Sequence, residues 1–207
     1  MPGNIIILSL DFYDLLENLD IPSDFLSIPH PFKKYSLLAA ARECGKPFTC
    51  HPMFGHDIIY THKSCRGSVI GRTADRDFLE FVSGVEKLEG GVYLSVGSAV
   101  MSPMIFEKAL SMARNAAIAN NETACRPAAN HSENNGSSYR LPIAGCGIYV
   151  IDLQEASWDW SKGEPPMDNP AYYLRYMKTF NRMGCRAQYI TADNRNFFVS
   201  LYKSLAG

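Results

Sequence analysis

The most chemically distinctive stretch of the chain lies between residues 152 and 163, which hold both tryptophans, three acidic residues and a lysine. Aromatic faces and carboxylates together attract a cation, because ring quadrupoles and negative charges draw ammonium groups while the rings exclude water. Desolvation in the same surroundings favours the neutral amine of a lysine, which can then attack a carbonyl or imine carbon. The stretch therefore predicts a site for a small cationic substrate beside Lys162. The alternative is that Trp158 and Trp160 pack beneath a long loop while Lys162 is solvated.

Two loops that join a strand to a helix offer a second kind of chemistry. Gly97 follows the apolar run at 92–96, and a glycine there lets the backbone approach a ligand closely. The amides at the start of the next helix attract an anion such as a dinucleotide phosphate, although a simple tight turn explains the same residues. In the other loop, Asp193 can either cap the last helix or accept hydrogen bonds from a ribose or an amide. In an open α/β sheet, ligands usually bind where such loops leave the carboxyl ends of the strands.

A third group of residues is the histidine loop, where His51, His56 and His62 accompany Asp57 and Cys65. Their spacing matches no tight zinc pattern, so the sequence predicts no metal site. One of the histidines could instead serve as a hydrogen-bonding or acid/base group.

The elements that must position these residues alternate along the chain. Short β-branched runs alternate with amphipathic stretches, which is typical of βαβ units around a mostly parallel sheet with helices on both faces. The predicted strands are 5–10, 48–51, 92–96, 148–153 and 187–191. The predicted helices are 34–44, 74–88 capped by Thr73, 103–118 capped by Ser102, 169–183, and a last helix that ends at about 205. We expect a single α/β domain over residues 1–207, with a polar surface loop at about 120–140.

Composition excludes several classes of protein. The 207 residues are 46% hydrophobic and 20% charged, with a net charge of −1, and these ordinary globular values exclude disorder, collagen and coiled coil. A near-neutral chain without a basic patch gives no reason to expect nucleic-acid or membrane binding. The longest apolar run, residues 5–10, is far shorter than the roughly 20 residues of a bilayer span, and the first four residues lack the basic start of a signal peptide. We therefore predict a cytoplasmic protein, whose six scattered cysteines are reduced thiols.

The run E-A-S-W-D-W-S-K at residues 155–162 resembles the E-A-V-S-W-G-K signature of deoxyhypusine synthase, with one residue inserted. Downstream, residues 189–205 are similar to that family's final Y-A-D strand, turn and helix. Upstream, G-K-P-F-T-C-H-P at 45–52 and G-H-D-I-I-Y-T-H at 55–62 resemble its I-P-V-F-x-P strand and G-D-M-I-F-x-H segment. Residues 92–115 occupy the place of its G-G-G loop and L-M-R-N helix. The order and spacing of these pieces agree over about residues 35–205.

The resemblance implies a Rossmann-like, NAD-binding fold and a transferase that moves the aminobutyl group of spermidine, or of a related polyamine, through imine intermediates. It implies that Lys162 is the catalytic residue that forms the imine. The implied substrate-binding residues are Asp152, Glu155, Trp158 and Trp160, and the implied NAD-binding residues are Gly97, Ser98, Ala192 and Asp193. Because sites of that family are built between two subunits, we expect a homo-oligomer or pairing with a homologous chain.

Several positions depart from the family pattern. The G-G-G loop is replaced by Val96-Gly97-Ser98, and the K-H-H that follows it is replaced by Met101-Ser102-Pro103. The family's acid/base histidine is therefore missing unless His51, His56 or His62 substitutes for it. The chain also begins where the family's sequence is already well advanced, which predicts an N-terminally shortened fold. These departures indicate a divergent deoxyhypusine synthase-like branch, and the alternative function is a catalytically inactive NAD-fold subunit or another nucleotide-binding protein.

Overall fold

The computed structural model describes residues 29–63, 65–98, 100–120, 143, 145–153, 158–163, 165–169, 179–180 and 183–207. The chain divides into two compact units, Met1–Phe81 and Val82–Gly207, and the division falls within helix α3 (Gly67–Glu86). A single domain over residues 1–207 stays a prediction. The expected strand at 5–10, all but the first residue of the loop at 120–140, and most of the expected helix at 169–183 lie outside the described residues. Within the described ranges, no helix is long and apolar enough to span a membrane.

The first unit is built from short helices. They are η1 (Lys33–Tyr35), α2 (Leu37–Glu43), η2 (Ile58–Thr61) and most of α3. Helix α2 confirms the helix predicted at 34–44 and is capped by Ser36, whose hydroxyl accepts a hydrogen bond from the N–H of Ala39 at 3.3 Å. The described side chains of this unit are all exposed or half-buried, so the buried core belongs to the second unit.

Two predictions in the first unit are wrong. Residues 48–51 do not form a strand, because the N–H of Cys50 donates to the carboxylate of Asp77 at 2.7 Å rather than to a neighbouring strand. The helix expected at 74–88 is present, but it begins earlier and contains Thr73 instead of being capped by it. The Thr73 hydroxyl donates to the carbonyl oxygens of Val69 and Ile70, as a threonine inside a helix commonly does.

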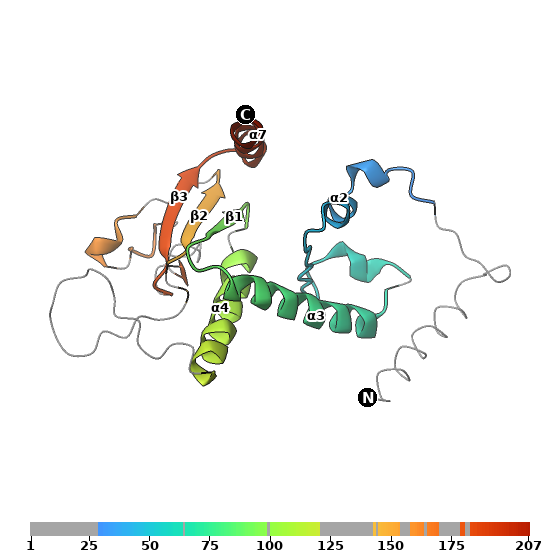
Figure 1. Cartoon of the computed structure of the whole chain (residues 1–207), viewed down its shortest axis with the longest axis horizontal. Helices are drawn as coiled ribbons and strands as arrows, with labels where there is room; N and C mark the ends of the chain where they lie inside the picture. The colour runs from blue at the N-terminus through green and yellow to red at the C-terminus, as the bar shows by residue number, and fades with distance from the viewer. Residues whose placement is uncertain are drawn as a thin grey trace. The chain divides into compact units, whose positions relative to one another are not determined.

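The second unit holds a three-stranded parallel sheet in the order β1 (Val92–Val96), β2 (Gly147–Asp152), β3 (Arg186–Thr191) (Figure 1). These strands confirm the predicted ones to within a residue at each end. In the register, Val92 lies opposite Gly147, and Gly147 lies opposite Arg186. The carboxyl ends of all three strands therefore lie at the same edge of the sheet. With its helices, this sheet makes the protein a mixed α/β fold.

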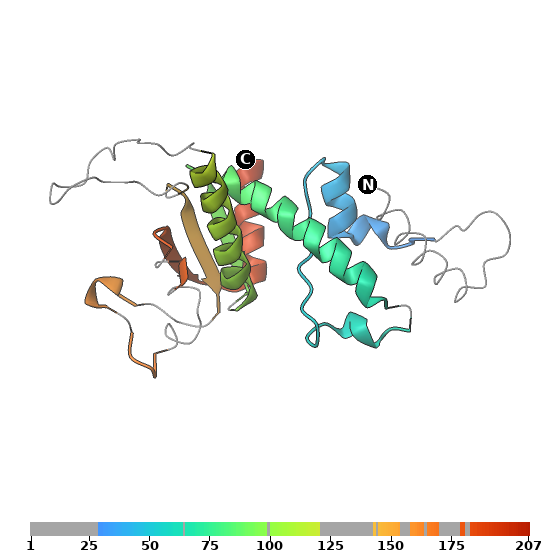
Figure 2. The same cartoon turned by 90° about the horizontal axis from the view of Figure 1, so that it is seen from below.

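Helix α4 (Met101–Ala119) follows β1, precedes β2 in the sequence and packs along the sheet (Figure 2). Its buried apolar residues follow the spacing of one helix face and are Phe106, Ala109, Leu110 and Ala113. The Phe106 ring is fully buried, with its centroid 4.5 Å from that of Tyr93 on β1 and 5.5 Å from that of Phe180. The core of the unit is therefore an aromatic cluster between α4 and one face of the sheet.

The start of α4 differs from the prediction. Ser102 lies inside the helix and is not its cap, because the hydroxyl of Ser98 reaches the N–H of Ser102 at 2.9 Å. The Ser102 hydroxyl is instead hydrogen-bonded to the Tyr93 hydroxyl at 2.8 Å. Pro103 is still accommodated, since the first turn of a helix needs no N–H from that position.

Helix α7 (Asn194–Ala206) follows β3, contacts β2 and confirms the last predicted helix. None of its residues is buried, and Phe198, Tyr202 and Leu205 are exposed. Its first turn is nevertheless anchored at the carboxyl edge of the sheet, where the candidate site lies.

Candidate functional site

The ends of β1 and β3 come together at Gly97 and Asn194. Gly97 has a φ of +64°, in the left-handed region that favours glycine. A β-carbon at this position would lie 2.5 Å from the side-chain nitrogen of Asn194, the first residue of α7. The Gly97 N–H donates to the carbonyl of Ile151 at 3.0 Å, and the Ala192 N–H donates to the carbonyl of Asp152 at 2.9 Å. Both loops are thus held against the end of β2, which lies between them.

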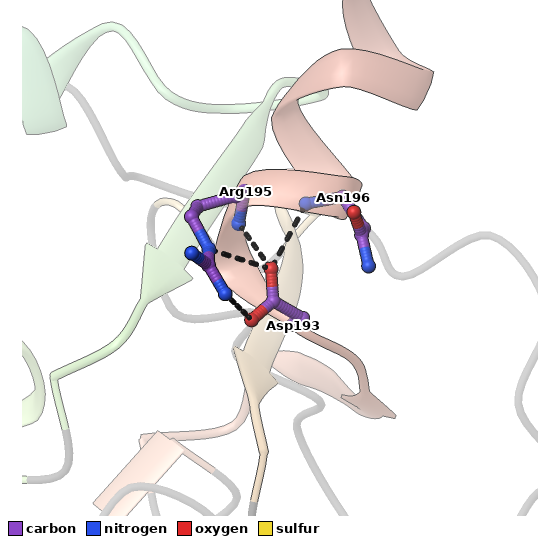
Figure 3. Close-up of polar contacts among 3 residues, drawn as sticks. All are labelled: Asp193, Arg195 and Asn196. Carbon is purple, nitrogen blue, oxygen red and sulfur yellow. Dashed lines mark hydrogen bonds and ion pairs between the residues drawn. The ribbon is translucent and has the colours of Figure 1, made fainter.

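Asp193 is the N-cap of α7 (Figure 3). Its Oδ1 accepts hydrogen bonds from the N–H groups of Arg195 at 3.0 Å and Asn196 at 3.1 Å. The guanidinium of Arg195 also donates to both carboxylate oxygens, at 3.3 and 3.2 Å. These hydrogen bonds, led by that from Arg195, lower the pKa of Asp193 below its ordinary value. The capping alternative for Asp193 is therefore confirmed, and its contact with a cofactor stays a prediction.

Two buried polar atoms near this edge have no hydrogen-bond partner in the described part of the chain: Oδ1 of Asn194 and Oγ of Ser95. Ser95 is only 2% exposed and lies on β1, two residues before Gly97. A buried acceptor without a donor is unfavourable by about 1–3 kcal/mol, so such atoms often mark the place of a missing partner. The sequence alone does not indicate Asn194, since only the pairing of β1 and β3 with β2 brings it beside Gly97.

Ser98 lies at the same edge and stabilises the start of α4. Its hydroxyl accepts from the N–H of Ser102 and so satisfies one of the amides at the start of α4 that lack an intrahelical partner. A serine hydroxyl that accepts one hydrogen bond keeps its own proton to donate. Gly97 and Ser98 lie on one of the two loops that meet at this edge, and Ala192 and Asp193 lie on the other, while their contact with NAD stays a prediction.

The segment after β2 folds locally around Asp159. Its Oδ1 accepts from the N–H of Ser161 at 3.1 Å and from the Ser161 hydroxyl at 2.7 Å, which begins the short helix η3 (Trp160–Lys162). The ammonium of Lys162 lies 3.8 Å from the other Asp159 oxygen, and the Lys162 side chain is 71% exposed. Lys162 is therefore solvated, and the described residues do not provide the desolvation expected of a nucleophilic lysine.

The other predicted substrate residues are only partly described. Trp158 is half-buried, and its indole N–H donates to the carbonyl of Gly163 at 2.9 Å, closing the loop over η3. Asp152 accepts through Oδ1 from the N–H of Leu153 at 2.7 Å. Glu155 and the side chain of Trp160 lie outside the described residues. Within the described ranges, the polar contacts of Lys162 are with Asp159, so its convergence with Gly97 stays a prediction.

His51, one candidate for the missing acid/base group, lies in the first unit. Its Nε2 is 3.0 Å from the hydroxyl of Thr49, and its ring meets those of Phe78 and Phe81 edge-on. Burial lowers the pKa of His51 below 6.5, and the negative charge of Asp77 only partly opposes this shift. The shift therefore favours the neutral imidazole of His51. Among the described residues, no group of three or more His, Cys, Asp and Glu side chains could hold a metal ion.

Comparison of the chain with models of protein families, with curated proteins and with solved structures finds no match. The resemblance to deoxyhypusine synthase therefore rests on the sequence motifs alone, and what it implies is carried forward as a proposal.

Proposed function

We propose that the chain is a Rossmann-like nucleotide-binding protein whose ligand is NAD, bound at the carboxyl ends of β1 and β3. The observation that carries this proposal is the unpartnered, buried Oδ1 of Asn194 beside the left-handed Gly97. A ligand hydroxyl or amide N–H placed there would satisfy this acceptor, and the ribose hydroxyls and the carboxamide of NAD are donors of this kind. The position also agrees with the general rule that ligands of parallel α/β sheets bind beyond the strand carboxyl ends.

The residues present fit such a ligand in distinct roles. Gly97 keeps the β1 loop close to Asn194, because any side chain at this position would meet the Asn194 amide. Ser98 retains a hydroxyl proton for a phosphate or ribose oxygen. Asp193 is committed to the cap of α7, so it acts by holding the first turn of α7, and with it Asn194, in place. Bound NAD would supply a hydride acceptor to this site.

Asn194→Leu tests the proposed site, because leucine has a similar shape but offers no hydrogen-bond acceptor. We expect NAD binding, measured by titration calorimetry on the full chain, to weaken roughly 10-fold or more, since a lost hydrogen bond to a buried group is worth about 1–3 kcal/mol. Asn196→Leu is the matched control: Asn196 is exposed, and only its backbone N–H contacts Asp193.

The titration has clear contrary outcomes. If the unaltered chain takes up no NAD at millimolar concentration, NAD is not the ligand. If Asn194→Leu binds NAD as tightly as Asn196→Leu does, NAD binds somewhere other than this edge of the sheet. Parallel titrations with ATP and with ADP-ribose separate a dinucleotide site from a general adenine-nucleotide site.

The second candidate function is the aminobutyl transfer from a polyamine that the sequence resemblance implies. The segment from Trp158 to Gly163 follows β2 in the sequence, and β2 ends at the edge of the sheet that also carries Gly97 and Asp193. Asp159 and the Trp158 ring would then attract an ammonium group of the polyamine. Spermidine would first become an imine by losing a hydride to bound NAD and a proton. The Lys162 amine would then add to the carbon of this imine and release diaminopropane, leaving the four-carbon unit bound to Lys162 as an imine. A second copy of the chain would supply the burial that Lys162 lacks.

Borohydride trapping tests this candidate. With NAD and spermidine present, reduction should leave a stable adduct on Lys162, located by peptide mass mapping, because borohydride converts a lysine imine to an amine. Lys108→Ala is the control, since Lys108 is also exposed and ion-paired, to Glu107 at 3.3 Å. A Lys162→Ala chain that traps as much spermidine-derived mass as Lys108→Ala does would exclude Lys162 as the nucleophile.

A further inference from the structure

A pair of buried thiols lies at the opposite edge of the sheet from the candidate site. Cys146 directly precedes β2, Cys185 directly precedes β3, and the strand register places the two residues opposite each other. Cys146 is fully buried and Cys185 nearly so. The two sulfur atoms are 3.6 Å apart, with the Cys146 thiol donating to the Cys185 sulfur. None of the functions considered above uses this pair.

The backbone geometry suits a covalent bond between the two sulfurs. Neighbouring strands lie about 4.8 Å apart, and disulfides join α-carbons separated by roughly 4.4–6.8 Å. A disulfide bond is about 2.05 Å long, so the sulfurs must approach by about 1.5 Å, which small side-chain rotations supply. The two strands need not separate or shift for the bond to form.

The surroundings of the pair are unfavourable for a thiolate but compatible with a disulfide. Burial, and then the neighbouring Cys146, raise the pKa of Cys185 to about 12, while the charge of Arg114 acts in the opposite direction. Arg114 is itself buried and donates to the carbonyl of Ile143 at 3.3 Å. A disulfide carries no charge and no hydrogen-bond donor, so it is compatible with this buried position, whereas a thiolate is not.

We propose that Cys146 and Cys185 are a redox-sensitive pair that closes to an intramolecular disulfide when the chain meets a small-molecule disulfide such as oxidised glutathione. The thiolate of one cysteine attacks a sulfur of the oxidant and releases one glutathione thiol. The second cysteine then displaces the other glutathione and forms the Cys146–Cys185 bond. The protein loses two hydrogens, and the oxidant is reduced to two thiols. Because the pair is buried and mostly protonated, the reaction is slow and proceeds through transient opening of the sheet end.

The bond would fasten the starts of β2 and β3, which are 39 residues apart along the chain. The closed loop contains Trp158 and Lys162 of the predicted substrate segment. Closing a loop of this length removes conformational freedom from the unfolded chain and stabilises the fold, typically by several kcal/mol in the loop-entropy description. The proposed pair therefore links the stability of the second unit to the redox state of its surroundings.

The test uses a full-length chain in which the other cysteines, Cys44, Cys50, Cys65 and Cys125, are replaced by serine. After equilibration with oxidised glutathione, we expect both remaining thiols to be lost and the intact mass to fall by two hydrogens without a glutathione adduct. We also expect a linked peptide pair containing Cys146 and Cys185, and a midpoint of thermal unfolding roughly 5–15 °C higher than in the reduced chain. A further Cys185→Ala replacement in this background should abolish the rise.

Other results would overturn the proposal. Two thiols that stay free, a stable mixed disulfide with glutathione, or a link between separate chains would each show that the pair does not close. If the serine background fails to fold, the same peptide map of the unaltered oxidised chain decides the question, with Cys65→Ala as the control that must leave the Cys146–Cys185 link unchanged.

Discussion

Phe106→Ala is expected to lower the free energy of unfolding of the second unit by about 3–5 kcal/mol. The Phe106 ring is fully buried in the middle of α4 and contacts the rings of Tyr93 and Phe180. Its removal forfeits the transfer free energy of an aromatic side chain and leaves a cavity that two rigid rings cannot fill by small shifts. Because a domain is stable by only about 5–15 kcal/mol, this one change removes a large part of the total.

Tryptophan fluorescence during urea unfolding measures this effect, because both tryptophans of the chain, Trp158 and Trp160, belong to the second unit. Phe198→Ala is the matched control: Phe198 is 53% exposed on α7, and its loss should cost less than about 1 kcal/mol. If the two substitutions shift the urea midpoint equally, the aromatic cluster is not the core of this unit.

The strands of the second unit could be predicted because their residue pattern is local. β-branched and aromatic residues fill β1, β2 and β3, and glycines or polar residues bound each of them. Residues 48–51 carry a similar pattern but form no strand. A strand needs a neighbour to accept and donate its backbone hydrogen bonds, and here Asp77 takes the Cys50 N–H instead. Composition indicates which segments can form strands, but it does not indicate whether a partner strand is near.

The residues that cap the helices could likewise be predicted only where the contact is local in the sequence. Asp193 is two residues past β3 and is of a residue type that favours the N-cap, so capping of α7 could be predicted as one of its two possible roles. Before α4, the sequence favours Ser102 as the cap, and this prediction is wrong. The N-cap position is Val100, the Ser98 hydroxyl accepts from the Ser102 N–H, and the Ser102 hydroxyl is bonded to Tyr93, a residue of β1. The outcome depends on how the loop packs against the sheet, which no helix preference encodes.

The candidate site was predictable only in its backbone features. Gly97 could be found from its position after an apolar run, because a left-handed residue is needed where a strand turns sharply into a helix. Asn194 could not be found in this way, since its neighbour in space lies about one hundred residues earlier in the sequence. Lys162 shows the converse: its neighbours in the sequence predict a desolvated amine, but a short helix around Asp159 presents it to solvent in the single chain.

Gly97→Ala is expected to destabilise the second unit by about 2–5 kcal/mol and to weaken NAD binding. An alanine at a φ of +64° bears a backbone penalty of about 1–2 kcal/mol, and its β-carbon, 2.5 Å from the Asn194 side-chain nitrogen, must push that side chain aside at a further cost of about 1–3 kcal/mol. The displacement moves the Asn194 oxygen from the position where a ligand donor would meet it. Urea unfolding followed by tryptophan fluorescence, and NAD titration of the same variant, measure the two effects.

Gly90→Ala separates the clash from the backbone penalty. Gly90 belongs to the same unit and has a φ of +74°, but a β-carbon built on it meets nothing within 4 Å. The Gly90→Ala variant should therefore lose only about 1–2 kcal/mol of unfolding free energy, the backbone penalty, and keep its affinity for NAD. In the double variant Gly97→Ala, Asn194→Ala, the shortened side chain at 194 removes the clash. The double variant should therefore lose less unfolding free energy than the sum of the losses in the two single variants. Equal losses in Gly97→Ala and Gly90→Ala, or strict additivity in the double variant, would mean that Gly97 and Asn194 do not meet, and the proposed nucleotide site would lose its basis.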